Sequence, residues 1–188
     1  MNNIILFASG SGTNVENIVN FFRSDPEINV SHVLTNKPDA YVIQRAKKLG
    51  IPVNVFNRQD FYKDNTILDF LLKNAPDLIV LAGFLWLIPS DIITSFPGKI
   101  INIHPALLPK YGGKGMYGSK VHKAVVDNKE TESGITIHYV NEKYDEGNII
   151  FQAKCEILPD DTPENVAEKV HKLEYEHFPK VINDILKK

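Results

Sequence analysis

The sequence predicts an α/β fold with a mostly parallel, Rossmann-like sheet flanked by helices, an antiparallel strand pair and a C-terminal helix. Three observations lead to this prediction. Short apolar runs, typical of strands buried on both faces, alternate with segments of helical periodicity. A glycine-rich turn at residues 9–14 follows the first apolar run and precedes the first helical segment. Two later β-rich segments are separated only by residues 141–148, which is too short for a crossover helix.

The first half of the chain predicts strands and helices in alternation. Five strands are expected where apolar residues cluster between turn-forming residues, at residues 4–8, 30–35, 53–56, 78–82 and 100–104. Helices are expected between them, at residues 15–22, 40–49, 60–74 and 89–95. Val15, Ile18 and Phe22 share one face of the first helix, and Gly50 suits the C-cap of the second. Because helices connect the strands, the strands should be parallel.

The pattern changes in the second half. A helix with Ser119 as its N-cap is expected at residues 119–128, followed by an antiparallel strand pair at residues 135–140 and 149–157. The residues Thr162-Pro163-Glu164 are typical of a helix start, and Pro179 should kink or interrupt the final helix. We find no internal repeat or linker, so we expect one domain over residues 1–188.

The composition is that of a folded protein without a polyanion partner. The 188 residues are 43% hydrophobic and 23% charged, with a formal net charge of −2. This near-neutral balance gives no reason to expect nucleic-acid binding. The lone Cys155 indicates a reducing compartment, and no basic signal-peptide region precedes the first apolar run. The longest apolar run, residues 78–88, is too short to span a bilayer, so we expect a cytoplasmic protein without a membrane partner.

The glycine-rich turn at residues 9–14 is the first candidate binding site. Glycines between a strand and a helix let backbone N–H groups approach an anion, and the helix dipole stabilises a phosphate there. The alternative is a simple tight turn. A dinucleotide fingerprint fits badly, because Val15 stands where its third glycine would be and no acid follows the second strand. The turn therefore suits a monophosphate.

Asn102 and His104 end the fifth predicted strand, at the sheet edge where open α/β folds bind ligands. Strand alternation places both side chains on one face, so an amide donor and a proton-exchanging imidazole lie together. This pairing suits a reaction through an oxyanion. Asp145 could orient the imidazole. The alternatives are a packed histidine at a strand end and a solvated acid in a hairpin loop.

Other residues carry weaker signals. His171 and Glu174 lie three apart on the last helix and could reach one ligand together, or form a solvated surface pair. Residues 81–88 are either core or the wall of a pocket for a flat ligand. No partner pattern is evident for His32, His122 or His138. No metal-ligand spacing is present, so we expect no metal.

Together these motifs resemble a known family. Residues 102–111, Asn-Ile-His-Pro-Ala-Leu-Leu-Pro-Lys-Tyr, are similar to the signature of the folate-dependent formyltransferases. The turn at residues 9–14, Leu-Ala-Gly-Phe at 81–84 and Asp-Glu-Gly at 145–147 narrow the resemblance to the branch that formylates glycinamide ribonucleotide. The resemblance covers nearly the whole chain and keeps the order and spacing of all motifs.

The resemblance implies direct formyl transfer from 10-formyltetrahydrofolate, a co-substrate, to the amine of glycinamide ribonucleotide in de novo purine biosynthesis. It makes Asn102, His104 and Asp145 the catalytic residues. Asn102 and protonated His104 would stabilise a tetrahedral oxyanion, and His104 would serve proton transfer to the leaving folate nitrogen. Asp145 would raise the pKa of His104 and order a relaying water.

The resemblance also implies two substrate sites. The ribonucleotide residues would be Gly12, Thr13, Asn14, His171 and Glu174, with Glu174 near the glycinamide amine. The folate residues would be Arg58, Leu85, Trp86, Leu87, Ile88, Asn102, Asn141, Glu142, Lys143, Tyr144 and Asp145. The family often has Arg where this chain has Trp86, and it suggests a cis bond before Pro109. The partners would be these small molecules, with the protein a monomer or homodimer. A sugar-nucleotide N-formyltransferase and a non-catalytic phosphoribosyl-binding module are the alternatives.

Overall fold

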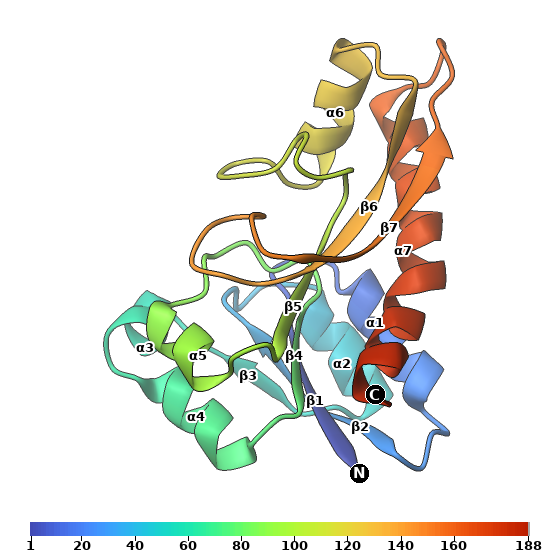
Figure 1. Ribbon diagram of the computed structural model, residues 1–188. Coiled ribbons are helices and arrows are strands. Elements are labelled where there is room, and N and C mark those ends of the chain that lie inside the picture. Colours follow the sequence, from blue (N-terminus) through green and yellow to red (C-terminus); the bar gives the residue numbers. More distant parts are fainter. Residues whose placement is uncertain (188) are drawn as a thin grey trace.

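A computed structural model describes residues 1–187, and its strands form a single mixed sheet (Figure 1). The strands are β1 Asn2–Phe7, β2 Ile28–Thr35, β3 Val53–Val55, β4 Leu78–Leu81, β5 Ile100–His104, β6 Glu132–Tyr139 and β7 Ile149–Glu156. Their order in the sheet is β3-β2-β1-β4-β5-β6-β7. The first five strands are parallel, whereas β6 pairs antiparallel with β5 and β7 pairs antiparallel with β6. The predicted fold class is confirmed.

Helices cover both faces of this sheet. They are α1 Thr13–Phe22, α2 Val42–Leu49, α3 Arg58–Tyr62, α4 Thr66–Asn74, α5 Ser90–Ser95, α6 Ser119–Asp127 and α7 Pro163–Leu186. Figure 1 shows α1, α2 and α7 on one face and α3, α4 and α5 on the other. Successive β1 residues point to opposite faces. Ile4 and Leu6 therefore join one core cluster with α1, α2 and α7, and Ile5 and Phe7 join the other.

The single helix predicted for residues 60–74 is wrong, because the structure has two helices there, α3 and α4. Asn57 starts α3 by accepting hydrogen bonds from the backbone N–H groups of Gln59 and Asp60. Asn65 then adopts a left-handed conformation with φ of 54° before α4. Asparagine tolerates this conformation better than most residues, so the chain can turn between two short helices.

Of the two effects expected at Pro179, a kink or an interruption, the interruption is wrong, because α7 continues through this residue to Leu186. A proline has no N–H group, so the Tyr175 carbonyl loses its partner within the helix. The side-chain amide of Asn17 in α1 donates to that carbonyl at 2.9 Å. A contact between two helices thus replaces the missing bond. The predicted start of α7 is confirmed, since the Thr162 hydroxyl accepts from the N–H of Asn165.

β1 and β5 end at the same carboxyl edge of the sheet, with β4 between them, and the segments that follow them have special backbone geometry. Gly12, just before α1, has φ of 76°, and a Cβ there would lie 2.4 Å from Cγ2 of Val42. Only glycine fits this close approach. After β5, the Leu108–Pro109 bond is cis, as the resemblance suggests.

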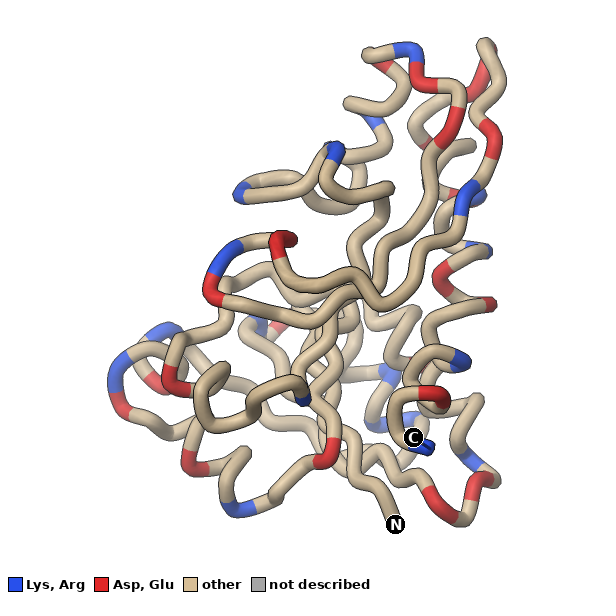
Figure 2. The backbone as a smooth tube through the Cα atoms, in the orientation of Figure 1, with Lys and Arg blue, Asp and Glu red and all other residues tan. Residues whose placement is uncertain are grey.

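Charged side chains of both signs are spread along the chain, in line with its formal net charge of −2. Figure 2 shows acidic and basic residues interspersed along the chain. None of the helices within residues 1–187 has the length and apolar character needed to cross a membrane.

Candidate active site

A cavity of about 600 Å³ lies at the carboxyl edge of the sheet, where open α/β folds bind ligands. The predicted site residues that line it are Gly12, Thr13, Asn14, Leu85, Trp86, Leu87, Ile88, Asn102, His104, Lys143, Tyr144, Asp145, His171 and Glu174. The three other predicted residues, Arg58, Asn141 and Glu142, lie outside this lining. Segments distant in the sequence therefore meet around one space.

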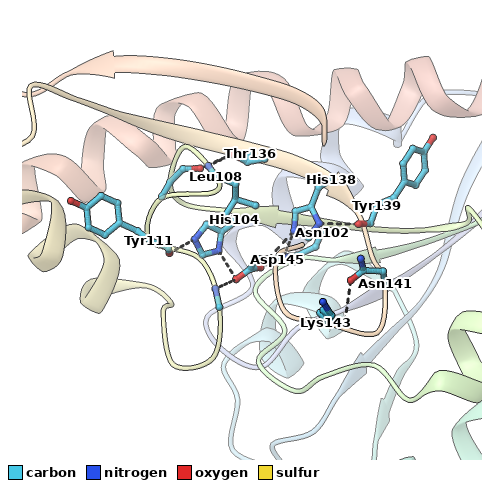
Figure 3. Close-up of polar contacts among 12 residues, drawn as sticks. Asn102, His104, Leu108, Tyr111, Thr136, His138, Tyr139, Asn141, Lys143 and Asp145 are labelled. Carbon is cyan, nitrogen blue, oxygen red and sulfur yellow. Dashed lines mark hydrogen bonds and ion pairs between the residues drawn. The ribbon is translucent and has the colours of Figure 1, made fainter. Parts of the chain in front are cut away.

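Asp145 lies among the polar side chains that end β5 (Figure 3). Its Oδ2 is 3.5 Å from Nδ1 of His104, and its Oδ1 is 3.5 Å from Nδ2 of Asn102. The N–H of Gly113 donates to Oδ2 at 2.9 Å. Burial raises the pKa of Asp145, but His138, His104 and the Gly113 N–H together lower it by more, so the net pKa lies below its ordinary value. The carboxyl group is therefore ionised at neutral pH.

His104 is only 3% exposed and lies between two acceptors. Its Nε2 is 2.7 Å from the carbonyl oxygen of Tyr111. A carbonyl can only accept, so Nε2 carries a proton. Burial lowers the pKa of His104, and Asp145 and the Tyr111 carbonyl raise it by less, leaving it below its ordinary value. Asp145 acts in the direction that the resemblance implies, and burial has the larger, opposite effect on the pKa of His104.

His138 is a site residue that the sequence analysis missed. It pairs directly opposite Asn102 across β5 and β6 and is only 2% exposed. Its Nδ1 is 2.9 Å from the Tyr139 carbonyl and therefore carries a proton. Its Nε2 lies 3.1 Å from Nδ2 of Asn102 and 3.6 Å from Oδ1 of Asp145. His138 thus orients the Asn102 amide. The alternation of β5 and β6 could have indicated this contact only if their register had been known.

The turn after β1 presents free backbone donors to the cavity. No side chain caps the N-terminus of α1, so its first N–H groups remain available. Arg45 fixes the turn, because its Nε donates to the Ser11 carbonyl at 2.9 Å and its guanidinium pairs with Glu16. The Ser9 hydroxyl donates to Oδ1 of Asn36 at 2.7 Å. This rigid turn and the helix dipole suit an anion.

Helix α7 closes the cavity on the side of this turn. Glu174 is only 7% exposed, and its Oε2 accepts from Nδ2 of Asn14 at 2.9 Å. Burial raises the pKa of Glu174, and the Asn14 amide and His171 offset only part of this effect. Among the described residues, Oδ1 of Asn14 has no hydrogen-bond partner. Glu174 and Asn14 therefore offer acceptors to a ligand that carries N–H or O–H groups.

His122 in α6 is a second buried histidine that the sequence did not single out. It is 3% exposed, lines the cavity, and its ring centroid lies 6.3 Å from that of His171. Its Nδ1 has no partner within residues 1–187. Burial, with smaller effects of His171 and His104, lowers the pKa of His122 to about 4.

Trp86 lines the cavity and is supported by aromatic residues behind it. Trp86 is half-buried and packs against Phe56, Phe61 and Tyr62, with ring centroids 5.9 to 6.0 Å apart. The Arg58 guanidinium lies 4.9 Å from the centroid of the Trp86 ring. Trp86 thus belongs both to the edge of a core cluster and to the cavity wall, so the two interpretations of residues 81–88 are both partly right.

Comparisons with known proteins agree with this geometry. The family model described as formyl transferase matches residues 2–182. Chloroplastic phosphoribosylglycinamide formyltransferase of Arabidopsis thaliana is 42% identical over 189 residues, which cover 97% of this chain and 64% of that protein. Phosphoribosylglycinamide formyltransferase of Haemophilus influenzae is 40% identical, with 97% of this chain and 86% of that protein covered.

A solved structure is similar over the same extent. Glycinamide ribonucleotide transformylase 1 from Geobacillus kaustophilus superposes with a TM-score of 0.89 at 35% identity, covering 99% of each chain. This chain spans about 64% of the Arabidopsis relative's length, so that protein has further residues without a counterpart here. Because the family model matches nearly all of the sequence, the chain belongs to the formyl transferase family, a family of enzymes that transfer formyl groups.

Proposed function

We propose that this chain transfers the formyl group of 10-formyltetrahydrofolate to the amine of glycinamide ribonucleotide, a step of de novo purine biosynthesis. The observation that supports this most is the meeting of Asn102, His104 and Asp145 in one cavity with the anion-binding turn before α1. Relatives of similar sequence are named for this activity. A single formyltransferase domain in the cytoplasm, acting on small molecules, is part of the same proposal.

Asn102 and His104 would stabilise the charge that develops during transfer. Attack of the amine on the formyl carbon puts negative charge on the formyl oxygen and positive charge on the amine nitrogen. The Asn102 amide is a donor that can bind this oxygen, and a positive charge on the nearby His104 ring would stabilise it electrostatically. His138 holds the Asn102 amide in place, so this donor is oriented before the reaction begins.

The depressed pKa of His104 suits a proton carrier. An oxyanion beside the buried ring raises the pKa of His104 during the reaction, so the ring then takes up the proton that the attacking ammonium loses. It delivers this proton to the departing folate nitrogen as the carbon–nitrogen bond breaks, and the tetrahedral intermediate collapses to the formyl amide. Ionised Asp145 stabilises the imidazolium in between and orders a water that relays protons.

The cavity has separate places for the two substrates. The ribonucleotide phosphate would bind the N–H groups of Gly12, Thr13 and Asn14, with His171 and Glu174 completing this side. The pterin ring would lie between residues 85–88 and the loop at residues 141–145. Arg58, held beside the Trp86 ring, would meet the acidic tail of the folate.

A formyl-transfer assay tests the proposal. Purified protein is given both substrates, and folate absorbance is followed for the parent chain, His104→Ala and His32→Ala. His32 packs against Phe70 and does not line the cavity, so it is the matched control. We expect turnover that requires both substrates and is lost only in His104→Ala. Deformylation of the folate without the ribonucleotide would contradict the proposal, and so would the absence of turnover with both substrates present.

A further inference from the structure

The glycine-rich segment after β5 contacts both members of the proton-transfer pair through its main chain. The Tyr111 carbonyl lies 2.7 Å from Nε2 of His104, and the Gly113 N–H donates to Oδ2 of Asp145 at 2.9 Å (Figure 3). The polarity of each contact matches its target. An acceptor faces the imidazole N–H, and a donor faces the carboxylate. Two residues apart in sequence, these groups hold His104 and Asp145 toward each other.

The backbone at this contact is in an uncommon conformation. Tyr111 has φ of 57°, Gly113 has φ of 94° and Asp145 has φ of 56°. Left-handed conformations are disfavoured for bulky residues and persist only where surrounding contacts maintain them. The Tyr111 hydroxyl supplies such a contact by donating to Oε1 of Glu130 at 2.9 Å, and Lys110 pairs with the same carboxylate. Glu130 lies outside the cavity, on the approach to β6.

Gly112 allows the segment to approach Asp145. A Cβ at this position would lie 2.7 Å from Cδ2 of Leu108 and 3.3 Å from Cβ of Asp145. Gly113 and Gly115 differ from Gly112, because a Cβ on either would meet nothing within 4 Å, while both have φ above 90°. A side chain at 112 would therefore displace Leu108 and press on Asp145, and conformation favours glycine at 113 and 115.

We propose that residues 111–113 form a main-chain latch that positions the His104–Asp145 pair, and that the Tyr111–Glu130 hydrogen bond holds this latch in place. Tyr111, Gly112, Gly113 and Glu130 are thus positioning residues that act through His104 and Asp145. The inference rests on the proposed function, since it concerns the same proton transfer. It also assigns a role to two of the glycines that precede α6, Gly112 and Gly113.

The latch should affect the pKa of His104. The charged and titratable groups around His104 are Asp145, His138 and His122, together with the Tyr111 carbonyl dipole. Asp145 and the carbonyl raise the pKa of His104 against burial. Releasing the latch removes part of both effects, so the pKa of His104 should fall further. A change that merely loosened the cavity mouth would alter substrate KM instead.

The matched pair Gly113→Ala and Gly115→Ala tests the latch. Both substitutions place a Cβ in open space at nearly the same φ, but only residue 113 contacts Asp145. For Gly113→Ala we expect kcat to fall by about 10-fold or more, because small misplacements of reacting groups are costly. KM for both substrates should change little. The ring signals of His104 in NMR, assigned with His104→Gln, should titrate at lower pH than in the parent.

Gly115→Ala should keep the parent's His104 titration, whatever it does to the rate. Equal shifts in the two variants, or no shift in Gly113→Ala, would overturn the latch. Tyr111→Phe supplies an independent test if Gly113→Ala folds poorly, because it removes only the hydroxyl that binds Glu130. It should lower the His104 pKa in the same direction, and an unchanged titration would also overturn the proposal. Absence of transfer in the parent chain would instead refute the proposed function.

Discussion

The two sides of the cavity each bury a carboxyl group beside a histidine, yet the pKa values shift in opposite directions. Asp145 receives the Gly113 N–H and lies near His104 and His138, and its pKa is lowered. Glu174 receives one amide hydrogen bond from Asn14, and its pKa is raised. Burial alone raises both. The number of donors and positive charges around each carboxyl group therefore decides the direction in which its pKa shifts.

The histidines on the two sides differ in a similar way. Burial lowers the pKa of both His104 and His122. Asp145 and the Tyr111 carbonyl oppose this effect at His104, whereas Nδ1 of His122 has no partner in the described part of the chain. In the proposed mechanism, His104 therefore exchanges protons, whereas the His122 imidazole is neutral at neutral pH.

Removing each histidine is the strongest test of this contrast. His104→Ala should lower kcat by about 1,000-fold, within the range of general acid–base catalysis. His122→Ala should lower kcat by less than about 10-fold, because His122 is not required for proton transfer in the proposed mechanism. Steady-state kinetics of both variants gives the comparison. Similar losses of kcat would mean that the two sides of the cavity do not have separate roles.

Isosteric replacement of the two carboxyl groups should separate their kinetic effects. Asp145→Asn removes the charge that stabilises the imidazolium, so kcat should fall by about 100-fold with KM little changed. Glu174→Gln keeps the shape of a group whose pKa is already raised. Its main effect should be an increase of a few-fold, about 1 kcal/mol, in KM for the ribonucleotide. A larger kcat effect for Glu174→Gln than for Asp145→Asn would reverse the assignment.

Acid should destabilise the folded protein through His122. As pH falls from the ordinary pKa of 6.5 toward about 4, the unfolded chain gains a proton at this residue that the folded chain does not bind. The free energy of unfolding therefore falls through this window. His122→Gln lacks this contribution, so its Tm should rise relative to the parent as pH decreases. A difference in Tm that is independent of pH would show that His122 titrates normally in the folded state.

The smallest expected effect concerns stability at higher pH. The folded pKa of Glu174 lies above its ordinary value of 4.5, so unfolding becomes more favourable as pH rises from that value to the folded pKa. Glu174→Gln should therefore gain Tm relative to the parent over this range.

Asp145 has a folded pKa below its ordinary 3.8, and the stability it contributes is lost only as pH falls below that value. The Tm difference of Asp145→Asn should thus be constant in the same range, and parallel curves for the two variants would contradict the contrast.

Local patterns in the sequence predicted most of the sheet and several site contacts. The apolar runs indicated where the strands lie along the chain. The last of the first five runs ends in Asn102 and His104, which lie at the end of β5. Errors arose where a non-local contact compensated for a local signal. The Asn17 amide satisfies the carbonyl that Pro179 leaves free, and no feature near Pro179 in the sequence indicates this.

The sequence by itself determined the α/β class, the glycine-rich turn between β1 and α1 and the family, because each depends on residues adjacent in the chain. Only the tertiary structure decided the partner of His138, the isolation of His122 and the opposite pKa shifts of Asp145 and Glu174. The physical reason is that burial and hydrogen bonding depend on which segments pack together. Charge states in the cavity therefore follow from contacts between residues that are distant in the chain.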